Sequence, residues 1–494
     1  MNLSLLIIVP LLTAISILFT KEAKATKLIS LLGASLQLVL VLFLLTSYLQ
    51  ERSAGNTAPM LFEYNYVWFA PLHINYHIGV DGISIAMILL TALVVLAGIL
   101  VSWTIDKWNR EYFFLLLLLS MGAYGFFISL DLFTLFFFLE VAVIPKFLLI
   151  GIWGSGKKEY SAMKLALMLM GGSALVFVGL AGLFFHTNTF DIIQIAQLHI
   201  PLATQKLFFP FAFIGFGIFT ALFPFHTWVP DGHSSAPTAA SMFLAGISMK
   251  LGGYGCLRVA TYLMPDAAHA YSGIIIALAT IAIIYGAFAT MMQKDLKYIN
   301  AYSSVSHCGF VLLGIGMLTK TSINGAVLQM VSHGLMTALF FAAIGMIYGR
   351  THTRMVAQLG GLLKVTPFIS SVFVIAGLCS LGLPGFSGFV AEMTVFMGSW
   401  QNPDTLYRLA TILACASIVV TAVYILRATG KTIMGPISQS YLRLTDATWN
   451  EKLAAGVLIT GIVIIGVAPF LINQLIAGGT DTLMQQIGKT IISK

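Results

Sequence analysis

The chain has 494 residues, of which 59% are hydrophobic and only 9% are charged, with a formal net charge of +8. Because a soluble domain carries about 25% charged residues, this composition excludes a water-soluble fold and indicates a polytopic membrane protein. The sequence has no glycine-rich nucleotide-binding motif, and its four cysteines show no metal-ligand spacing. We therefore expect no cofactor or redox centre on this chain, and nothing in the sequence indicates nucleic-acid binding.

Apolar runs of about 20 residues, the length that crosses a bilayer, follow one another along the chain. The first run precedes the first basic residue, Lys21, so we interpret it as a retained span and not as a signal peptide, which carries its positive charge first. The predicted fold is an all-α integral membrane protein with about 14 transmembrane helices. These spans are expected near 2–20, 27–48, 79–102, 112–129, 130–152, 160–186, 206–226, 235–263, 272–292, 296–318, 322–349, 366–400, 405–433 and 453–477.

The loops between these spans predict an orientation. If both termini lie outside, the odd-numbered loops face the cytoplasm, and those loops hold most of the loop lysines and arginines. An excess of positive charge on the cytoplasmic side is the general rule for membrane proteins. We therefore expect both termini on the outer face of the lipid bilayer.

Two of the predicted spans are interrupted. Three prolines within 224–237 break the seventh span before the eighth begins, and a run of glycine and proline within 382–388 breaks the twelfth. Broken helices at matching positions in two halves indicate a transporter built from inverted repeats. The alternative is that these residues have no special meaning, because proline and glycine are common in membrane helices.

Five ionisable residues fall near the middle of predicted spans: Glu140, Lys250, His307, His333 and Glu392. A charge at that depth costs about 2.5–3.5 kcal/mol on insertion scales, so such residues are usually paired or functional. The pattern favours a proton path. One alternative is a static ion pair between Glu140 and Lys250. The others are that the two histidines are hydrogen-bonded core residues and that Glu392 caps the backbone of the broken twelfth helix.

Other polar residues have simpler interpretations. Lys164, near the start of the sixth span, is included among the candidates for the proton path, and the alternative is that its side chain extends to the surface. His226 and His233 flank the first break, where we expect them to bond to freed backbone groups. Asp81 and Asp131 stand at span starts, where a carboxylate suits a helix N-terminus.

Four segments resemble the proton-conducting, antiporter-like subunits of NADH-quinone oxidoreductase, respiratory complex I. The segments are DLFTLFFFLEVAVIP (131–145), PFHTWVPDGHSSAPTAASMFLAGISMKLGGYGCLR (224–258), NAYSSVSHCGFVLLGI (300–315) and GLPGFSGFVAEMTVFMGS (382–399). Together they are most similar to the subunit M, or chain 4, branch of that family. The resemblance implies N-terminal helices at 1–111, two inverted five-helix repeats at 112–263 and 272–433 with broken helices 7 and 12, and a C-terminal loop and helix at 434–494.

The resemblance also implies a function. Family members are subunits of a translocase in which electron transfer from NADH to quinone, on other subunits, drives proton translocation in the respiratory chain. The expected partners are L-like and N-like antiporter subunits, in the bacterial inner membrane. By motif match, Glu140 modulates the first half-channel and Lys250 joins the two halves. His307 and His333 lead on toward Glu392 at the exit of the second half-channel.

One position departs from the family pattern. The family usually has a lysine seven residues before the histidine of its PFHTW-like motif, and here that position is Phe219. An unusual lysine, Lys146, stands six residues after Glu140, about 9 Å further along the same helix. We hypothesise that Lys146 replaces the missing lysine as the partner of Glu140. The alternative is that Lys146 extends to the cytoplasmic surface and leaves the first half-channel impaired.

Three other functions share part of this pattern. Subunits of Mrp-type sodium/proton antiporters share the PFHTW-like segment and the central lysine, but tend to have a lysine where this chain has Glu392. A membrane subunit of an energy-converting hydrogenase is a further alternative. A scaffold without a channel is favoured only by Phe219, and gains nothing from four other buried ionisable residues.

Overall fold

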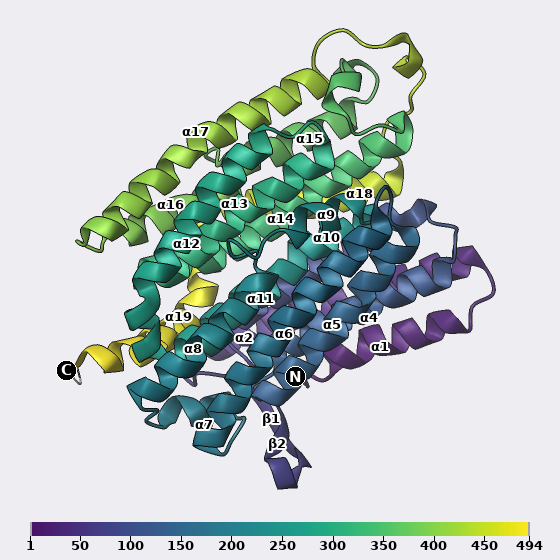
Figure 1. Ribbon diagram of the computed structural model, residues 1–494. Coiled ribbons are helices and arrows are strands. Elements are labelled where there is room, and N and C mark those ends of the chain that lie inside the picture. Colours follow the sequence, from purple (N-terminus) through teal and green to yellow (C-terminus); the bar gives the residue numbers. More distant parts are fainter. Residues whose placement is uncertain (1, 493–494) are drawn as a thin grey trace.

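The computed structural model describes the backbone of residues 2–492 and the side chains of residues 2–488. This part of the chain is almost entirely helical, with one β-hairpin near its start (Figure 1). The first part contains α1 (Leu5–Leu18), α2 (Ala23–Ser53), β1 (Leu61–Phe69), β2 (Ile74–Val80), α3 (Gly82–Val101), α4 (Asn109–Ile128), α5 (Leu132–Trp153), α6 (Lys158–Thr187), α7 (Ile192–Gln197) and α8 (Leu202–Phe219). The middle contains α9 (Trp228–Ser235), α10 (Thr238–Phe243), the π-helix η3 (Leu244–Ser248), α11 (Met249–Gly255) and the π-helix η4 (Cys256–Thr261). The last part contains α12 (Pro265–Met291), α13 (Leu296–Gly316), α14 (Lys320–Thr351), α15 (Pro367–Ser380), α16 (Ser387–Trp400), α17 (Thr405–Ile433), α18 (Trp449–Val467) and α19 (Pro469–Ile492).

Ten of the described helices are long and apolar enough to cross a membrane. The protein is therefore a multi-pass membrane protein, as predicted, while the count of 14 crossings stays a prediction. α13 is 21 residues long and is not among the ten. Its first half carries Lys297, Asn300, several serines and His307, which lower its hydropathy and which it buries. α13 is therefore missing from the ten because its buried polar side chains lower its mean hydropathy.

The helices form one bundle of roughly parallel rods (Figure 1). α4, α5, α6 and α8 lie on one side of it, and α12, α13, α15 and α17 lie on the other. α14 contacts α3, α10, η3, α13, α16 and α18, and the span that it contains is almost completely buried. Such a helix is surrounded by protein and not by lipid, so polar residues on it can face other polar residues.

Both predicted breaks are present. The chain leaves helical structure between Phe219 and Trp228, where Ala221 has a positive φ of 68°, and again before Pro237. A second interruption separates α15 from α16. Prolines remove the backbone donors that would continue a helix, and glycines permit the left-handed turns. The two breaks are therefore set by local sequence.

The β-hairpin was not predicted. Its strands pair antiparallel, with Asn65 opposite His77. His77 is buried, with its Nδ1 atom 2.7 Å from Asp191 Oδ2 and its Nε2 atom 3.5 Å from Glu63 Oε2. Although burial opposes it, the hydrogen bond and charge of Asp191, with the charge of Glu63, raise the pKa of His77. His77 therefore ties the hairpin to the segment that begins α7.

The C-terminal end differs from the prediction. The last span was expected to run to residue 477, but α18 ends at Val467 and a separate helix starts at Pro469. α19 is amphipathic, since it buries Leu475, Ile476, Leu483 and Ile487 on one face. It contacts α3, α12 and α14. Proline favours the first position of a helix and cannot continue an earlier one, which explains the boundary.

Candidate functional site

Lys250 lies in the middle of the bundle, on a helix of unusual form. α11 is flanked by the π-helical segments η3 and η4, and such π-bulges occur frequently at functional sites. The side chain is 1% exposed, and its Nζ atom donates to the carbonyl oxygen of Ala245 in η3. The same atom lies 2.8 Å from Nδ1 of His333 on α14. The ammonium group is thus held between two helices inside protein.

From Lys250 the polar groups continue across the second half of the bundle. The rings of His333 and His307 stack with centroids 5.3 Å apart. Nδ1 of His307 lies 3.3 Å from Oε1 of Glu392 on α16, and its Nε2 atom lies 3.1 Å from Oγ of Ser380. The structure therefore brings four of the predicted residues into one buried cluster, ordered Lys250, His333, His307 and Glu392.

His307 Nδ1 has two neighbours that favour different protonation states. Nε2 of Gln329 lies 3.2 Å away and donates to Nδ1 when that nitrogen carries no proton. The carboxylate of Glu392 accepts from Nδ1 when it does carry one. Nδ1 of His307 therefore has a hydrogen-bonding neighbour whether or not it carries a proton.

The second helix break positions Glu392. Gly382 has a positive φ of 73°, and a Cβ atom there would lie 2.7 Å from Oε2 of Glu392. A Cβ atom on Gly388 would lie 2.1 Å from the carbonyl oxygen of Cys379. Because real Cβ atoms do not approach backbone this closely, both glycines let the broken ends and the carboxylate come together.

Lys146 and Glu140 form a second group in the first half, both on α5. Lys146 is 1% exposed, so it does not extend to the surface. Its Nζ atom lies 5.7 Å from the ring centroid of Phe219 and within electrostatic range of Glu140. Nζ of Lys146 and Oε1 of Glu140 are both buried, and neither has a hydrogen-bond partner among the described residues. The ammonium group thus reaches the side chain that replaces the family lysine.

Lys164 joins the two halves near the first break. Its Nζ atom lies 2.7 Å from Oδ2 of Asp231 on α9, and Oδ1 of Asp231 accepts from the hydroxyl of Tyr298 on α13 at 3.2 Å. Lys164 is only 24% exposed. Its side chain is therefore used in a polar contact between α6, α9 and α13, and not only in reaching the surface.

The family model described as NADH:quinone oxidoreductase/Mrp antiporter, TM, matches residues 129–419. That range contains all seven predicted site residues. The chain belongs to this family.

Relatives and solved structures match most of the chain. NADH-quinone oxidoreductase subunit M of Rickettsia prowazekii is 36% identical over 474 residues, which cover 94% of this chain and 95% of the relative. NAD(P)H-quinone oxidoreductase chain 4-2 of Synechocystis sp. is 39% identical over 391 residues, covering 78% of this chain and 70% of the relative. A chain of respiratory complex I from Thermus thermophilus has the same fold, with a TM-score of 0.90, 24% identity and coverage of 98% of this chain and 100% of that one. A chain of the Mrp complex from Dietzia sp. shares it at a TM-score of 0.86 and 18% identity, covering 98% of each chain.

This family member contains buried polar groups that sequence reasoning missed. Lys297, at the start of α13, is buried and donates to the carbonyl oxygen of Ala236 at 2.5 Å. His233 is completely buried. The ammonium groups of Lys250 and Lys297 both lie within electrostatic range of its ring. His233 was expected to bond to freed backbone groups, and the backbone of Ser241 lies close enough to interact with its ring. Only the path of the chain around the first break brings these groups together.

A second missed feature is a buried ion pair. Arg258 lies in η4 at 1% exposure and pairs with Asp81. Asp81 also caps α3, as predicted, by accepting from the amide of Ser84 at 2.9 Å. Asp131 caps α5 in the same way. Within residues 2–488, no cluster of three or more histidine, cysteine or acidic side chains is arranged to hold a metal ion.

Proposed function

We propose that this chain is the antiporter-like, proton-translocating subunit M of a bacterial NADH-quinone oxidoreductase. The observation that carries the proposal is the buried cluster from Lys250 to Glu392. Ionisable groups in a membrane interior are costly unless they serve conduction or pairing, and here they follow one another at contact distance. Relatives of nearly equal length that are named subunit M support the same assignment.

The cluster supports a stepwise proton transfer. A proton on Nζ of Lys250 passes to Nδ1 of His333, which it already contacts. The two histidine rings stack and do not hydrogen-bond, so the next step needs a ring rotation or a bridging water molecule. From His307 the proton passes to the carboxylate of Glu392. Each site is surrounded by protein, so the proton does not leak into lipid.

Glu140 and Lys146 are proposed to control this transfer from the first half, and Lys164 with Asp231 to connect that half to the membrane surface. A charge near Glu140 changes how strongly a proton is held elsewhere in the buried line, because Coulomb interactions are weakly screened inside protein. Electron transfer from NADH to quinone is placed on other subunits. The chain is proposed to carry no redox centre or cofactor, consistent with its dispersed cysteines.

The proposed partners are L-like and N-like antiporter subunits in the membrane arm of the same complex. The proposed location is the bacterial inner membrane, with both termini outside. The fold shared with chains of respiratory complex I and the Mrp complex supports membership of a multi-subunit membrane assembly.

A Lys250→Met variant tests the proposal. Removing the central ammonium group interrupts the line, so proton pumping and coupled quinone reduction should fall on the order of tenfold or more. The measurements are NADH-driven acidification of inverted membrane vesicles and quinone reductase activity, with assembly followed on native gels. Lys206→Met, which changes an exposed lysine, is the control. Unchanged pumping in a fully assembled Lys250→Met enzyme would support the scaffold alternative.

The Mrp-type function is the second candidate, because the matching family includes both groups. An Mrp-type subunit exchanges sodium ions for protons, whereas the proposed oxidoreductase subunit moves protons alone. If NADH leaves transport unaffected and a sodium gradient drives proton movement, the Mrp assignment replaces the first. Glu392, where Mrp-type relatives tend to have a lysine, favours the oxidoreductase.

A further inference from the structure

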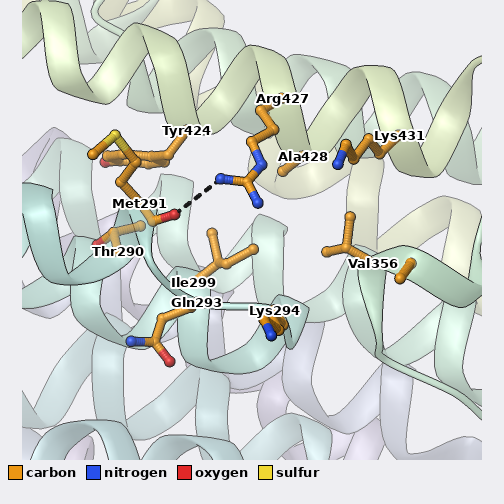
Figure 2. A pocket seen from close by; sticks show the side chains of 11 residues that line it. Thr290, Met291, Gln293, Lys294, Ile299, Val356, Tyr424, Arg427, Ala428 and Lys431 are labelled. Carbon is orange, nitrogen blue, oxygen red and sulfur yellow. Dashed lines mark hydrogen bonds between the residues drawn. The ribbon is translucent and has the colours of Figure 1, made fainter.

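A pocket of about 260 Å³ lies between α17 and the turn that joins α12 to α13 (Figure 2). Met291 and Ile299 form one wall, and Tyr424 on α17 contributes to the other. Arg427 projects from α17 into the space between these elements, and its Nη1 atom donates to the carbonyl oxygen of Met291 at 3.3 Å. The proposed function assigns no role to this pocket.

Three cations surround the pocket, and no carboxylate lines it. Lys294 comes from the turn, and Arg427 and Lys431 come from successive turns of α17. None of the three forms an ion pair with an acidic residue anywhere in residues 2–488. Three like charges around one concavity repel each other unless an anion lies between them. The charge distribution therefore fits a negatively charged ligand.

The pocket lies where helices end. α12 ends at Met291 and α17 ends at Ile433, so the pocket is at the membrane boundary and not in the hydrocarbon interior. Beside it, Phe288, Met292, Val423 and Leu426 expose large apolar side chains. A ligand with a charged head and apolar chains would match both the pocket and these flanking side chains.

Two simpler explanations account for only part of this arrangement. A preference for basic residues on one side of the membrane explains the sign of the charges, but not why three of them surround one hollow. Stabilisation of the C-terminal carbonyl groups of α12 explains Arg427, but not Lys294 and Lys431.

We propose that this pocket binds the phosphate headgroup of an anionic phospholipid, with the acyl chains along the exposed apolar side chains of α12 and α17. Basic pockets between membrane helices suit such headgroups. The occupant is a lipid and not free phosphate, because the apolar flank continues from the pocket toward the membrane interior. The proposal depends on the membrane fold and not on the proton-translocating function.

The test uses the assembled protein, exchanged into nanodiscs of phosphatidylcholine that contain a trace of photoactivatable phosphatidylglycerol. After irradiation, crosslinked peptides are identified by mass spectrometry. We expect crosslinks on residues 288–299 and 423–431, several-fold above those from a photoactivatable phosphatidylcholine. In the triple variant Lys294→Gln, Arg427→Gln, Lys431→Gln, these crosslinks should fall at least about tenfold.

Two variants control this result. Replacing Lys21, Lys24 and Lys157 by glutamine removes three exposed cations elsewhere and should leave the crosslinks unchanged. The charge-preserving variant Lys294→Arg, Arg427→Lys, Lys431→Arg should retain them, which separates lost binding from lost folding. Equal labelling by both lipids, displacement by inorganic phosphate, or crosslinks confined to another subunit that covers the pocket would each overturn the proposal.

Discussion

At the scale of single residues, the main feature is that buried charges have neighbours matched to them. Lys250 contacts a histidine nitrogen, and Glu392 contacts another. Lys146 and Glu140 are different, because the buried atoms Nζ of Lys146 and Oε1 of Glu140 have no hydrogen-bond partner among the described residues. A buried charge without a partner is costly, which makes Lys146 the position of the first half to test by substitution.

The Lys146 hypothesis predicts a second-site rescue. Lys146→Met should lower NADH-driven proton pumping severalfold, because the ammonium group next to Glu140 is lost. Adding Phe219→Lys to that variant should restore much of the rate, since the two side chains are adjacent and the new ammonium group occupies nearly the same space. Pumping is measured by acidification of inverted vesicles at equal assembly.

Controls for this rescue use the same two positions. Phe219→Leu in the Lys146→Met background changes the ring without adding charge and should not restore pumping. If Lys146→Met alone pumps normally, Lys146 is not the partner of Glu140, and the first half then works without a lysine at either position.

His77 predicts a pH dependence outside the membrane. Its pKa is raised and that of Asp191 is lowered by their mutual contact, against the effect of burial on each. The His77 contribution is therefore complete below about pH 6.5, its unfolded pKa, and is lost as pH rises through its folded value. The Asp191 contribution is present above about pH 3.9 and is lost as pH falls through its folded value. The hairpin should thus be held most tightly between these limits.

Hydrogen exchange of residues 61–80, corrected for the intrinsic rate at each pH, measures this effect. Protection should decrease from pH 6 to pH 9 in the native protein and be lower and nearly independent of pH in His77→Gln. The backbone of α14, which lacks this contact, is the internal reference. Constant protection of the hairpin across this range would show that the ion pair does not hold it.

At the scale of secondary-structure elements, irregular helix geometry places ionisable side chains where a regular α-helix would not. In an α-helix the backbone N–H and C=O groups hydrogen-bond to each other, and the side chains point outward at fixed angles. The break between α15 and α16 turns the chain so that Glu392 faces His307, and the glycines at the break leave room for that approach. The π-helices around α11 similarly reorient Lys250, whose ammonium group bonds back to Ala245 five residues earlier.

Gly388 tests the importance of close packing at the second break. In Gly388→Ala, the new methyl group would lie 2.1 Å from the carbonyl oxygen of Cys379, so α16 must shift. Overpacking of this kind costs about 1–3 kcal/mol, and we expect a lower unfolding temperature together with reduced proton pumping. Gly430→Ala in α17 is the matched control, because nothing lies within 4 Å of its added atom. That variant should be neutral or more stable by about 0.5–1 kcal/mol. Equal stability of the two variants would show that the break is loosely packed.

At the scale of the whole molecule, polar groups are sorted by depth and by side. Within this chain α3 and α14 are almost completely buried, whereas most of the membrane-spanning parts of α2, α17 and α18 is not. The hairpin with α7 lies at the opposite end of α5 and α6 from Lys157 (Figure 1). The excess of lysine and arginine in the loops that are expected on the cytoplasmic side predicts a single orientation in the membrane.

Cysteine labelling tests that orientation. The three buried cysteines and exposed Cys415 are replaced by alanine or serine, and one new cysteine is then placed at His186 or at Lys157, which are both exposed. A membrane-impermeant maleimide should label His186→Cys in intact spheroplasts and should label Lys157→Cys only in inverted vesicles. The reverse pattern would place the termini in the cytoplasm.

The local sequence was enough to predict the membrane class, most helix positions, both breaks and the five central ionisable residues, because hydropathy and proline or glycine placement act over short distances. The hairpin escaped this reasoning because its alternating aromatic residues stand outside any apolar run, and α19 escaped it because Pro469 divides a continuous apolar stretch. Tertiary structure alone decided that Lys297 and His233 are buried, that Arg258 pairs with Asp81, and that Lys146 reaches Phe219. These contacts join residues on different helices or across a turn, and their distances depend on how helices pack, which the order of residues along one helix does not contain.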